Sequence, residues 1–316
     1  MQTRNGGDKM DRANFCDSLC RQVLSVLGEE YRTELSQVRK NNGVMKDVLY
    51  VRKENSECIP CFYMDELYGS YCMGENEIGL AEYLSNVVLN ECDVVKEQAK
   101  EYLTKEWMVD NLFVRLLHFE KNAKWLENAV YVRVMDLAAV FYVLTEDCEE
   151  GVKSFQLPKN AWETLELGTA EEYFETAVEN TRRLFPEKLW CLEQRVAECE
   201  IKGDEPSCVL TEQQGAMYSH RLYVLTNHRR INGGMVMMYP GVLRRLSEKF
   251  SGSFYVIPSS IHEVLLLKAT EEEDANYLNR MVRAVNEQQV APEEVLADYV
   301  YFYDAEEQEL HSLTGN

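Results

Sequence analysis

The stretch from Leu222 to Leu267 constrains the fold most, because strand, turn and helix signals alternate within it. Leu222–Thr226 and Val264–Leu267 are apolar runs of strand length, each bordered by polar turn residues. Between them, Met235–Lys249 has the composition of a helix, with Pro240 near its start. Short strands joined by turns to helices favour an α+β fold over a doubly wound parallel sheet.

The same alternation recurs along the chain and predicts three lobes of strand pairs and helices around a mixed, mostly antiparallel sheet. The N-terminal lobe covers residues 1–105, the middle lobe residues 106–193 and the C-terminal lobe residues 216–316. Residues 194–215 mix glycine, proline and charge, which indicates a linker or an excursion.

Apolar spacing also places single elements. Thr169 and Glu172 stand three residues apart, like a capping box that opens a helix running to Arg183. Further helices are predicted over residues 11–27, 78–103 and 274–287, and strands over residues 44–51, 109–119, 138–144, 152–157, 254–257 and 295–303.

The charge of the chain excludes several partners. There are 54 acidic and 33 basic residues, so the net charge is −21, which opposes binding to nucleic acid and to anionic membranes. No apolar run is long enough to cross a membrane, and the N-terminus has no apolar stretch of the kind found in signal peptides. We therefore expect a soluble, cytoplasmic protein that binds neither nucleic acid nor membrane.

The 10 cysteines are scattered along the chain, which is typical of reduced thiols rather than of a disulfide framework. Cys58 and Cys61 have the CxxC spacing, but no second CxxC or histidine pair completes a zinc site. A redox role for this pair stays open as an alternative. We expect no metal and no cofactor.

The known catalytic and nucleotide-binding signatures are missing from the sequence. There is no GxGxxG after a strand, no GxxxxGK[ST], no GxSxG and no HExxH. The Gly233-Gly234 pair lacks both the spacing and the lysine of a phosphate-binding loop. The absence of a complete motif favours a protein that is not an enzyme.

Polar side chains gather in two turns of the C-terminal lobe, and these are the candidate site. In an extended segment Ser260 and His262 would point to the same side, which permits a nucleophile–base pair. The alternative is a purely structural role, in which these side chains stabilise the turns through hydrogen bonds to backbone groups. The weak catalytic candidates are Ser259, Ser260, His262 and Glu263, and the binding candidates are Asn227, His228, Arg230, Ser260 and His262.

Tyr299, Tyr301 and Tyr303 alternate at strand spacing near the C-terminus. One face of a terminal strand is then aromatic, which suits either core packing or an interface. If the chain forms a homo-oligomer, we expect this strand to be its interface.

Several long segments resemble a family of bacterial proteins known only as domain of unknown function 5688, from about residue 12 to residue 304. The resemblance implies no catalytic residue, cofactor or partner. The family occurs mainly in gut-dwelling Firmicutes, and this origin is consistent with a reducing cytosol that keeps cysteine thiols reduced. The segments are Asn41–Val44, Asp136–Leu144, Glu179–Pro186, Tyr223–Asn227, Met238–Leu243, Pro258–Leu267 and Met281–Asp304.

Two hypotheses follow. The first, which we favour, is a non-enzymatic cytoplasmic protein whose C-terminal lobe presents Asn227–Arg230 and Pro258–Glu263 to an unknown protein or small-molecule partner. The alternative is an unrecognised hydrolase that uses Ser260 or Ser259 as nucleophile with His262 as base.

Overall fold

A computed structural model describes residues 9–54, 56, 59–98, 104–148, 151–192, 222–270 and 274–313. The chain divides into two compact units. Unit 1 contains residues 1–40 and 44–104, and unit 2 contains residues 41–43 and 105–316. The segment 194–215, predicted as a linker or an excursion, lies outside the described residues, and the division into three lobes stays a prediction.

Unit 1 is a three-stranded antiparallel sheet, in the order β1-β2-β3, with three helices. The first helix was predicted from its apolar spacing, and Phe15, Leu19, Val23 and Leu27 are its buried residues, while the Asp11 side chain caps its start. The elements are α1 (Arg12–Leu27), β1 (Tyr31–Arg39), β2 (Met45–Lys53), β3 (Cys61–Tyr63), α2 (Met64–Met73) and α3 (Glu77–Gln98).

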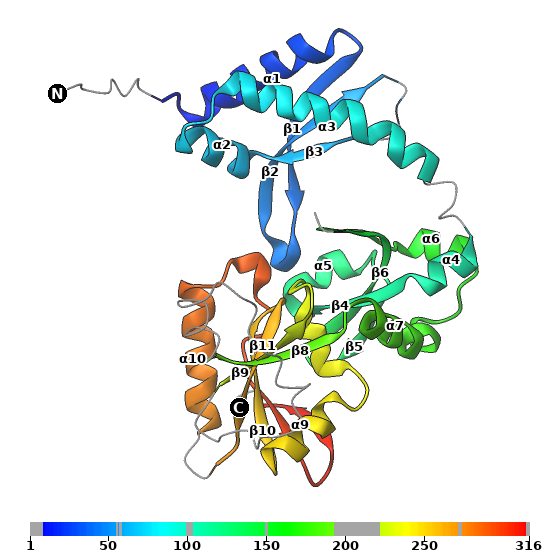
Figure 1. Ribbon diagram of the computed structural model, residues 1–316, viewed down its shortest axis with the longest axis vertical. Helices are drawn as coiled ribbons and strands as arrows, with labels where there is room; N and C mark the ends of the chain where they lie inside the picture. The colour runs from blue at the N-terminus through cyan, green and yellow to red at the C-terminus, as the bar shows by residue number, and fades with distance from the viewer. Residues whose placement is uncertain are drawn as a thin grey trace, which may run out of the picture. The chain divides into compact units, whose positions relative to one another are not determined.

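The described part of unit 2 contains two antiparallel sheets; Figure 1 draws the first in green and the second in colours that run from light green at its first strand in the chain to red at its last. In the first, β6 pairs with β4, β5 and β7; the second has six strands in the order β13-β12-β10-β11-β9-β8. The strands are β4 (Leu112–His118), β5 (Tyr131–Val134), β6 (Leu137–Cys148), β7 (Gly151–Gln156), β8 (Glu187–Cys191), β9 (Tyr223–Asn227), β10 (Phe254–Ser260), β11 (Glu263–Lys268), β12 (Tyr301–Asp304) and β13 (Glu309–Ser312).

Helices surround these sheets. The capping box predicted at Thr169 is confirmed: its side chain accepts from the Glu172 backbone, and the Glu172 side chain accepts from the Thr169 backbone. The α-helices are α4 (Lys105–Asp110), α5 (Ala123–Leu126), α6 (Lys159–Thr164), α7 (Ala170–Leu184), α9 (Val242–Phe250) and α10 (Ala275–Gln288), and the 3₁₀ turns are η1 (Asn41–Gly43), η2 (Glu120–Asn122), η3 (Gly233–Met238) and η4 (Pro292–Glu294).

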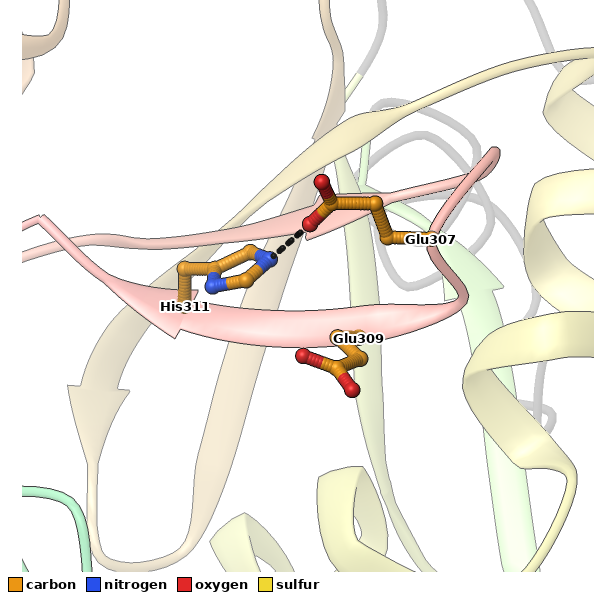
Figure 2. Close-up of side chains that lie close together, drawn as sticks. All are labelled: Glu307, Glu309 and His311. Carbon is orange, nitrogen blue, oxygen red and sulfur yellow. Dashed lines mark ion pairs between the residues drawn. The ribbon is translucent and has the colours of Figure 1, made fainter.

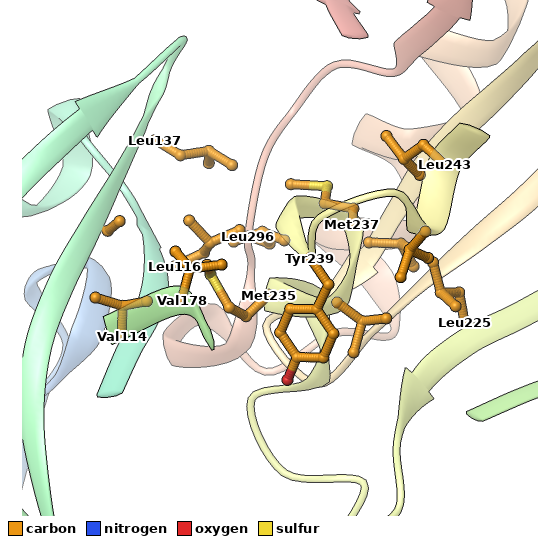
Figure 3. Packing of buried hydrophobic residues seen from close by; sticks show 14 of the residues in the cluster. Val114, Leu116, Leu137, Val178, Leu225, Met235, Met237, Tyr239, Leu243 and Leu296 are labelled. Carbon is orange, nitrogen blue, oxygen red and sulfur yellow. The ribbon is translucent and has the colours of Figure 1, made fainter. Parts of the chain in front are cut away.

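One apolar core extends through the middle and C-terminal parts of unit 2. Val114 and Leu116 of β4 and Val178 of α7 meet Met235 and Met237 of η3 in this core (Figure 3). Met235 and Met237 of η3 are therefore core residues, and the partly buried Met238 packs against the core. The α+β class with mostly antiparallel sheets is confirmed.

The structure corrects three element predictions. Met235–Lys249 is not one helix, because Pro240 interrupts it between η3 and α9, and Gly241 takes the left-handed conformation at φ 72°. Residues 258–263 are not a loop, because β10 runs to Ser260 and β11 starts at Glu263, with a register shift after Pro258. Only the end of the strand predicted over 295–303 forms, as β12.

In the part of the chain that is described, no helix combines the length and the apolar character that a membrane crossing requires.

Candidate functional site

The two polar turns singled out in the sequence lie next to each other in unit 2. The Gly234 backbone N–H donates to the Ile261 carbonyl at 3.0 Å, and the Thr226 hydroxyl donates to the His262 carbonyl at 2.7 Å. A Cβ at Gly233 would lie 2.4 Å from the same carbonyl oxygen. The turn after β9 and the turn between β10 and β11 are therefore joined at backbone distance, which requires glycine.

Ser260 and His262 are engaged in this turn. The Ser260 hydroxyl accepts the His262 backbone N–H at 3.0 Å, and His262 Nδ1 accepts the Asn232 backbone N–H at 3.2 Å. His262 Nε2 lies 3.5 Å from Glu294 Oε1. Because Nδ1 accepts a hydrogen bond, the neutral ring carries its proton on Nε2, facing Glu294. These bonds match the turn-capping alternative, and the catalytic role of Ser260 with His262 stays a prediction.

The residues after β9 form hydrogen bonds within the turn and ring contacts with neighbouring side chains. Asn227 is buried, accepts the Arg229 backbone N–H at 3.0 Å and donates to the Ile231 carbonyl at 2.8 Å. The His228 ring stacks on Phe185 with ring centroids 6.3 Å apart. Arg230 is exposed and lies over the Trp190 ring, 5.2 Å from its centroid. The predicted binding residues therefore do not converge on one cavity among the described residues.

A groove of about 540 Å³ opens beside this turn, along α10 and across the face of the six-stranded sheet. Its lining is almost entirely apolar, and a concave apolar site of this size is the usual form of a binding pocket. Of the predicted site residues, Ser259 lines this groove, and Glu263, at the start of β11, is not among its lining residues. The lining residues are Leu222, Ile257, Pro258, Ser259, Leu265, Leu267, Asp274, Tyr277, Leu278, Met281, Val282, Val285 and Asn286.

The floor of the groove follows from strand alternation. Val256, Val264 and Leu266 face the main core and are fully buried. Their neighbours Ile257 and Leu265 point to the opposite face, as successive strand residues must, and are only partly buried.

One helix forms the wall of the groove. Leu278 and Val282 of α10 pack on the sheet with exposed fractions of 7% and 5%. Tyr277, Met281 and Val285, at intervals of four residues, stay exposed at 55%, 46% and 43%. Apolar spacing would place Met281 and Val285 on the same helix face as Leu278 and Val282. In the structure Leu278 and Val282 form a packed stripe, whereas Met281 and Val285 belong to an open one.

A second polar cluster in unit 2 was not identified from the sequence. Asp298 accepts from Lys121 Nζ at 2.7 Å and from Asn286 Nδ2 at 3.2 Å, and His118 Nε2 lies 3.8 Å from its carboxylate. Tyr301, which is fully buried, donates its hydroxyl to Asp136 at 2.9 Å. These residues are far apart in sequence and carry no common motif, so only the fold brings them together.

Burial and charge shift the pKa values in this cluster. Burial raises the pKa of Asp298, but the hydrogen bond and charge of Lys121 outweigh it, so the pKa lies below 3.8. Burial lowers the pKa of His118 below 6.5, and the nearby Lys121 charge lowers it further. The folded protein therefore favours an ionised Asp298 and a neutral His118.

Unit 2 is expected to lose stability as the medium becomes acidic. The neutral His118 ring contributes fully above its unfolded pKa of 6.5 and less as the pH falls below it. Ionised Asp298 contributes fully above 3.8 and less as the pH falls through its lowered pKa. Urea unfolding at a series of pH values should show both losses, and Asp298→Asn should remove the loss that occurs at the lower pH. An unchanged acid slope in Asp298→Asn would contradict the assignment.

One group of side chains has the chemistry of metal ligands. Glu307, Glu309 and His311 at the β12–β13 hairpin place their ligand atoms within 4.8 Å of one another (Figure 2). His311 Nε2 already pairs with the Glu307 carboxylate at 3.2 Å, and both glutamates are exposed. Exposed acidic residues commonly form such groups without an ion, so this cluster is a surface ion pair with a neighbouring carboxylate.

The remaining candidates are resolved in part. Cys58 lies outside the described residues, and the pKa of Cys61 is raised, chiefly by partial burial, which disfavours a reactive thiolate. Tyr301 and Tyr303 pack in the core of unit 2, so these two side chains do not support the predicted oligomer interface.

The fold and this groove define an α+β protein with an open apolar groove on one face of its largest described sheet. The sequence matches a family of unknown function (DUF5688) over residues 12–305, and the chain belongs to that family. No curated protein and no solved structure matches it.

Proposed function

We propose that this chain is a non-enzymatic, cytoplasmic binding protein whose groove along α10 takes up an amphipathic helix of a partner protein. The observation that carries the proposal is the open apolar stripe Tyr277, Met281 and Val285 beside the apolar floor of Ile257 and Leu265. The binding surface lies in the C-terminal part of the chain, as the sequence favoured, but on the groove side of the turns rather than on their polar side.

The shape of the groove favours a helix as the occupant. Helices cover sheets as a second layer, and among the described residues α10 leaves Ile257 and Leu265 of the groove only partly buried. A second helix that lay beside α10 would cover the groove floor. It would also contact the open stripe of α10, whose residues are four apart and so lie on one face of that helix.

The charge of the chain indicates the polar side of such a helix. With a net charge of −21, the protein attracts basic partners and repels acidic ones. The groove-lining residues along α10 run from its N-cap Asp274 to Asn286, which are 13 residues and span about 18 Å at the rise of an α-helix. We therefore propose a basic amphipathic helix of about three turns.

The test uses a synthetic leucine–lysine peptide of about 14 residues with apolar residues at helical spacing. Fluorescence anisotropy of the labelled peptide should show saturable binding, and Met281→Glu should weaken it by at least about tenfold, or 1.4 kcal/mol. The added carboxylate would strengthen a purely electrostatic interaction, so weaker binding would identify the apolar contact.

The matched control is Val26→Glu, the same change at a side chain that is 50% exposed on α1 in unit 1. This variant should bind the peptide like the parent. Equal binding of a scrambled peptide, or undiminished binding to Met281→Glu, would refute the proposal. Binding of laurate at the groove without binding of the peptide would assign the groove to a small amphiphile instead.

A further inference from the structure

Arg115 is a partly buried cation on the sheet of β4 and β6, and its Nε atom is buried. Its guanidinium carbon lies 4.2 Å from the ring centroid of Tyr142 and 5.2 Å from that of Phe113. Its Nη2 donates to the Ser154 hydroxyl at 2.5 Å. The side chain is thus held by two aromatic rings and a neutral hydroxyl.

The charge of Arg115 has no acidic partner in the described ranges. Its Nε is buried and has no hydrogen-bond partner there. Burial lowers the pKa of the guanidinium, while Tyr142 raises it, and no carboxylate contributes. Arginine stays charged under these conditions. A buried charge without a counter-charge is costly, and a buried donor without an acceptor adds to that cost.

A small cavity adjoins Arg115 beside β4, where α7 covers the strand and the Thr181 hydroxyl accepts the Val114 backbone N–H at 3.0 Å. It has a volume of about 10 Å³ and is lined by Arg115, Phe113, Thr181, Phe185 and Asn232 together with other residues of unit 2. A volume of roughly 10–15 Å³ holds one water-sized particle. The cavity is too small for phosphate or sulfate, but a single-atom anion needs only a slight outward movement of the lining side chains.

We propose that this cavity binds one small monovalent anion, with chloride as the expected occupant, through the Arg115 guanidinium. The anion would supply the missing acceptor for Nε and the missing counter-charge. Attraction between opposite charges is strong where water is largely excluded, so binding at this position should stabilise unit 2. The site is independent of the groove along α10.

The first experiment compares thermal unfolding in sodium chloride and in sodium gluconate at equal ionic strength. All four tryptophans, Trp107, Trp125, Trp162 and Trp190, lie in unit 2, so their fluorescence reports this unit. Chloride should raise the Tm by about 2–4 °C in a saturable manner. Arg115→Met should lose the chloride dependence, while Arg32→Gln, at an exposed arginine of unit 1, should keep it. Identical melting in both salts would overturn the proposal.

The second experiment does not depend on a variant that folds. Crystals of the parent protein grown in sodium bromide should show an anomalous peak within hydrogen-bond distance of Arg115 Nε. A water molecule or no density there would overturn the proposal. Sodium formate in the melting series distinguishes a halide site from a carboxylate site, since formate should not reproduce the chloride effect if the cavity accepts only single atoms.

Discussion

Gly233→Ala is expected to destabilise unit 2 by about 3–4 kcal/mol. A Cβ at this position would lie 2.0 Å from the Thr226 hydroxyl oxygen, 2.4 Å from the His262 carbonyl oxygen and 2.9 Å from the Asn227 backbone nitrogen. Two of these atoms belong to the backbone, which cannot rotate away as a side chain can. The turn between β10 and β11 would have to separate from η3, and the hydrogen bond from Gly234 to Ile261 would be lost with it.

Urea unfolding followed by tryptophan fluorescence measures this loss in unit 2. Gly69→Ala is the matched control, because no atom lies within 4 Å of its added Cβ and the residue is inside α2. At this position alanine should leave the stability of unit 1 unchanged or raise it by about 0.5–1 kcal/mol. The unfolding of unit 1 can be followed by the circular dichroism of its tyrosines. A loss below about 1 kcal/mol in Gly233→Ala would show that the two turns are not in close contact.

Asn122→Ala is expected to cost about 2–4 kcal/mol. The Asn122 side chain is 97% buried, as its exposed fraction is 3%. Its amide nitrogen lies 2.8 Å from Asn41 Oδ1, 3.0 Å from Asn42 Oδ1 and 2.8 Å from the His118 carbonyl oxygen, so its two N–H groups are shared among three acceptors; its oxygen accepts the Asn42 backbone N–H at 2.8 Å. Alanine would remove these bonds and leave their partners without the side chain that satisfies them.

The measurement is the urea midpoint by tryptophan fluorescence, with Asn160→Ala as control. Asn160 is exposed on α6 in the same unit, so its truncation should change the free energy of unfolding by less than about 0.5 kcal/mol. Equal midpoints for the two variants would mean that water replaces the Asn122 bonds at no cost.

Local patterns in the sequence predicted the helices best. Both α1 and α7 follow from apolar spacing and from a capping residue, because these signals act within a few residues. The prediction of one helix over residues 235–249 was wrong at its start, where the apolar residues enter the core from a 3₁₀ turn. Apolar spacing alone does not distinguish such a turn from the first turn of an α-helix. Strand β1 was missed because its buried positions are few and irregular.

The candidate site was predictable only as a region. The sequence singled out Ser259, Ser260 and His262 as a polar group, but the partners of the His262 ring, Asn232 and Glu294, come from other segments of the chain. The groove forms because the sheet covers only one of the two apolar stripes of α10. The helix sequence contains both stripes and does not indicate which of them packs on the sheet. Arg115 likewise looks like an ordinary surface arginine until Phe113 and Tyr142 enclose it.

The short turn Asn41–Gly43 makes unit 2 discontinuous in the chain, since its flanking residues belong to unit 1. The Asn42 side chain donates to the carbonyls of Pro292 and Val295, which follow it by 250 and 253 residues. During synthesis on the ribosome, Asn42 therefore emerges long before these acceptors do. A protein cut at residue 104 would yield a C-terminal fragment that lacks Asn41 and Asn42, two of the partners of Asn122, so a split at this boundary separates two pieces of one folding unit.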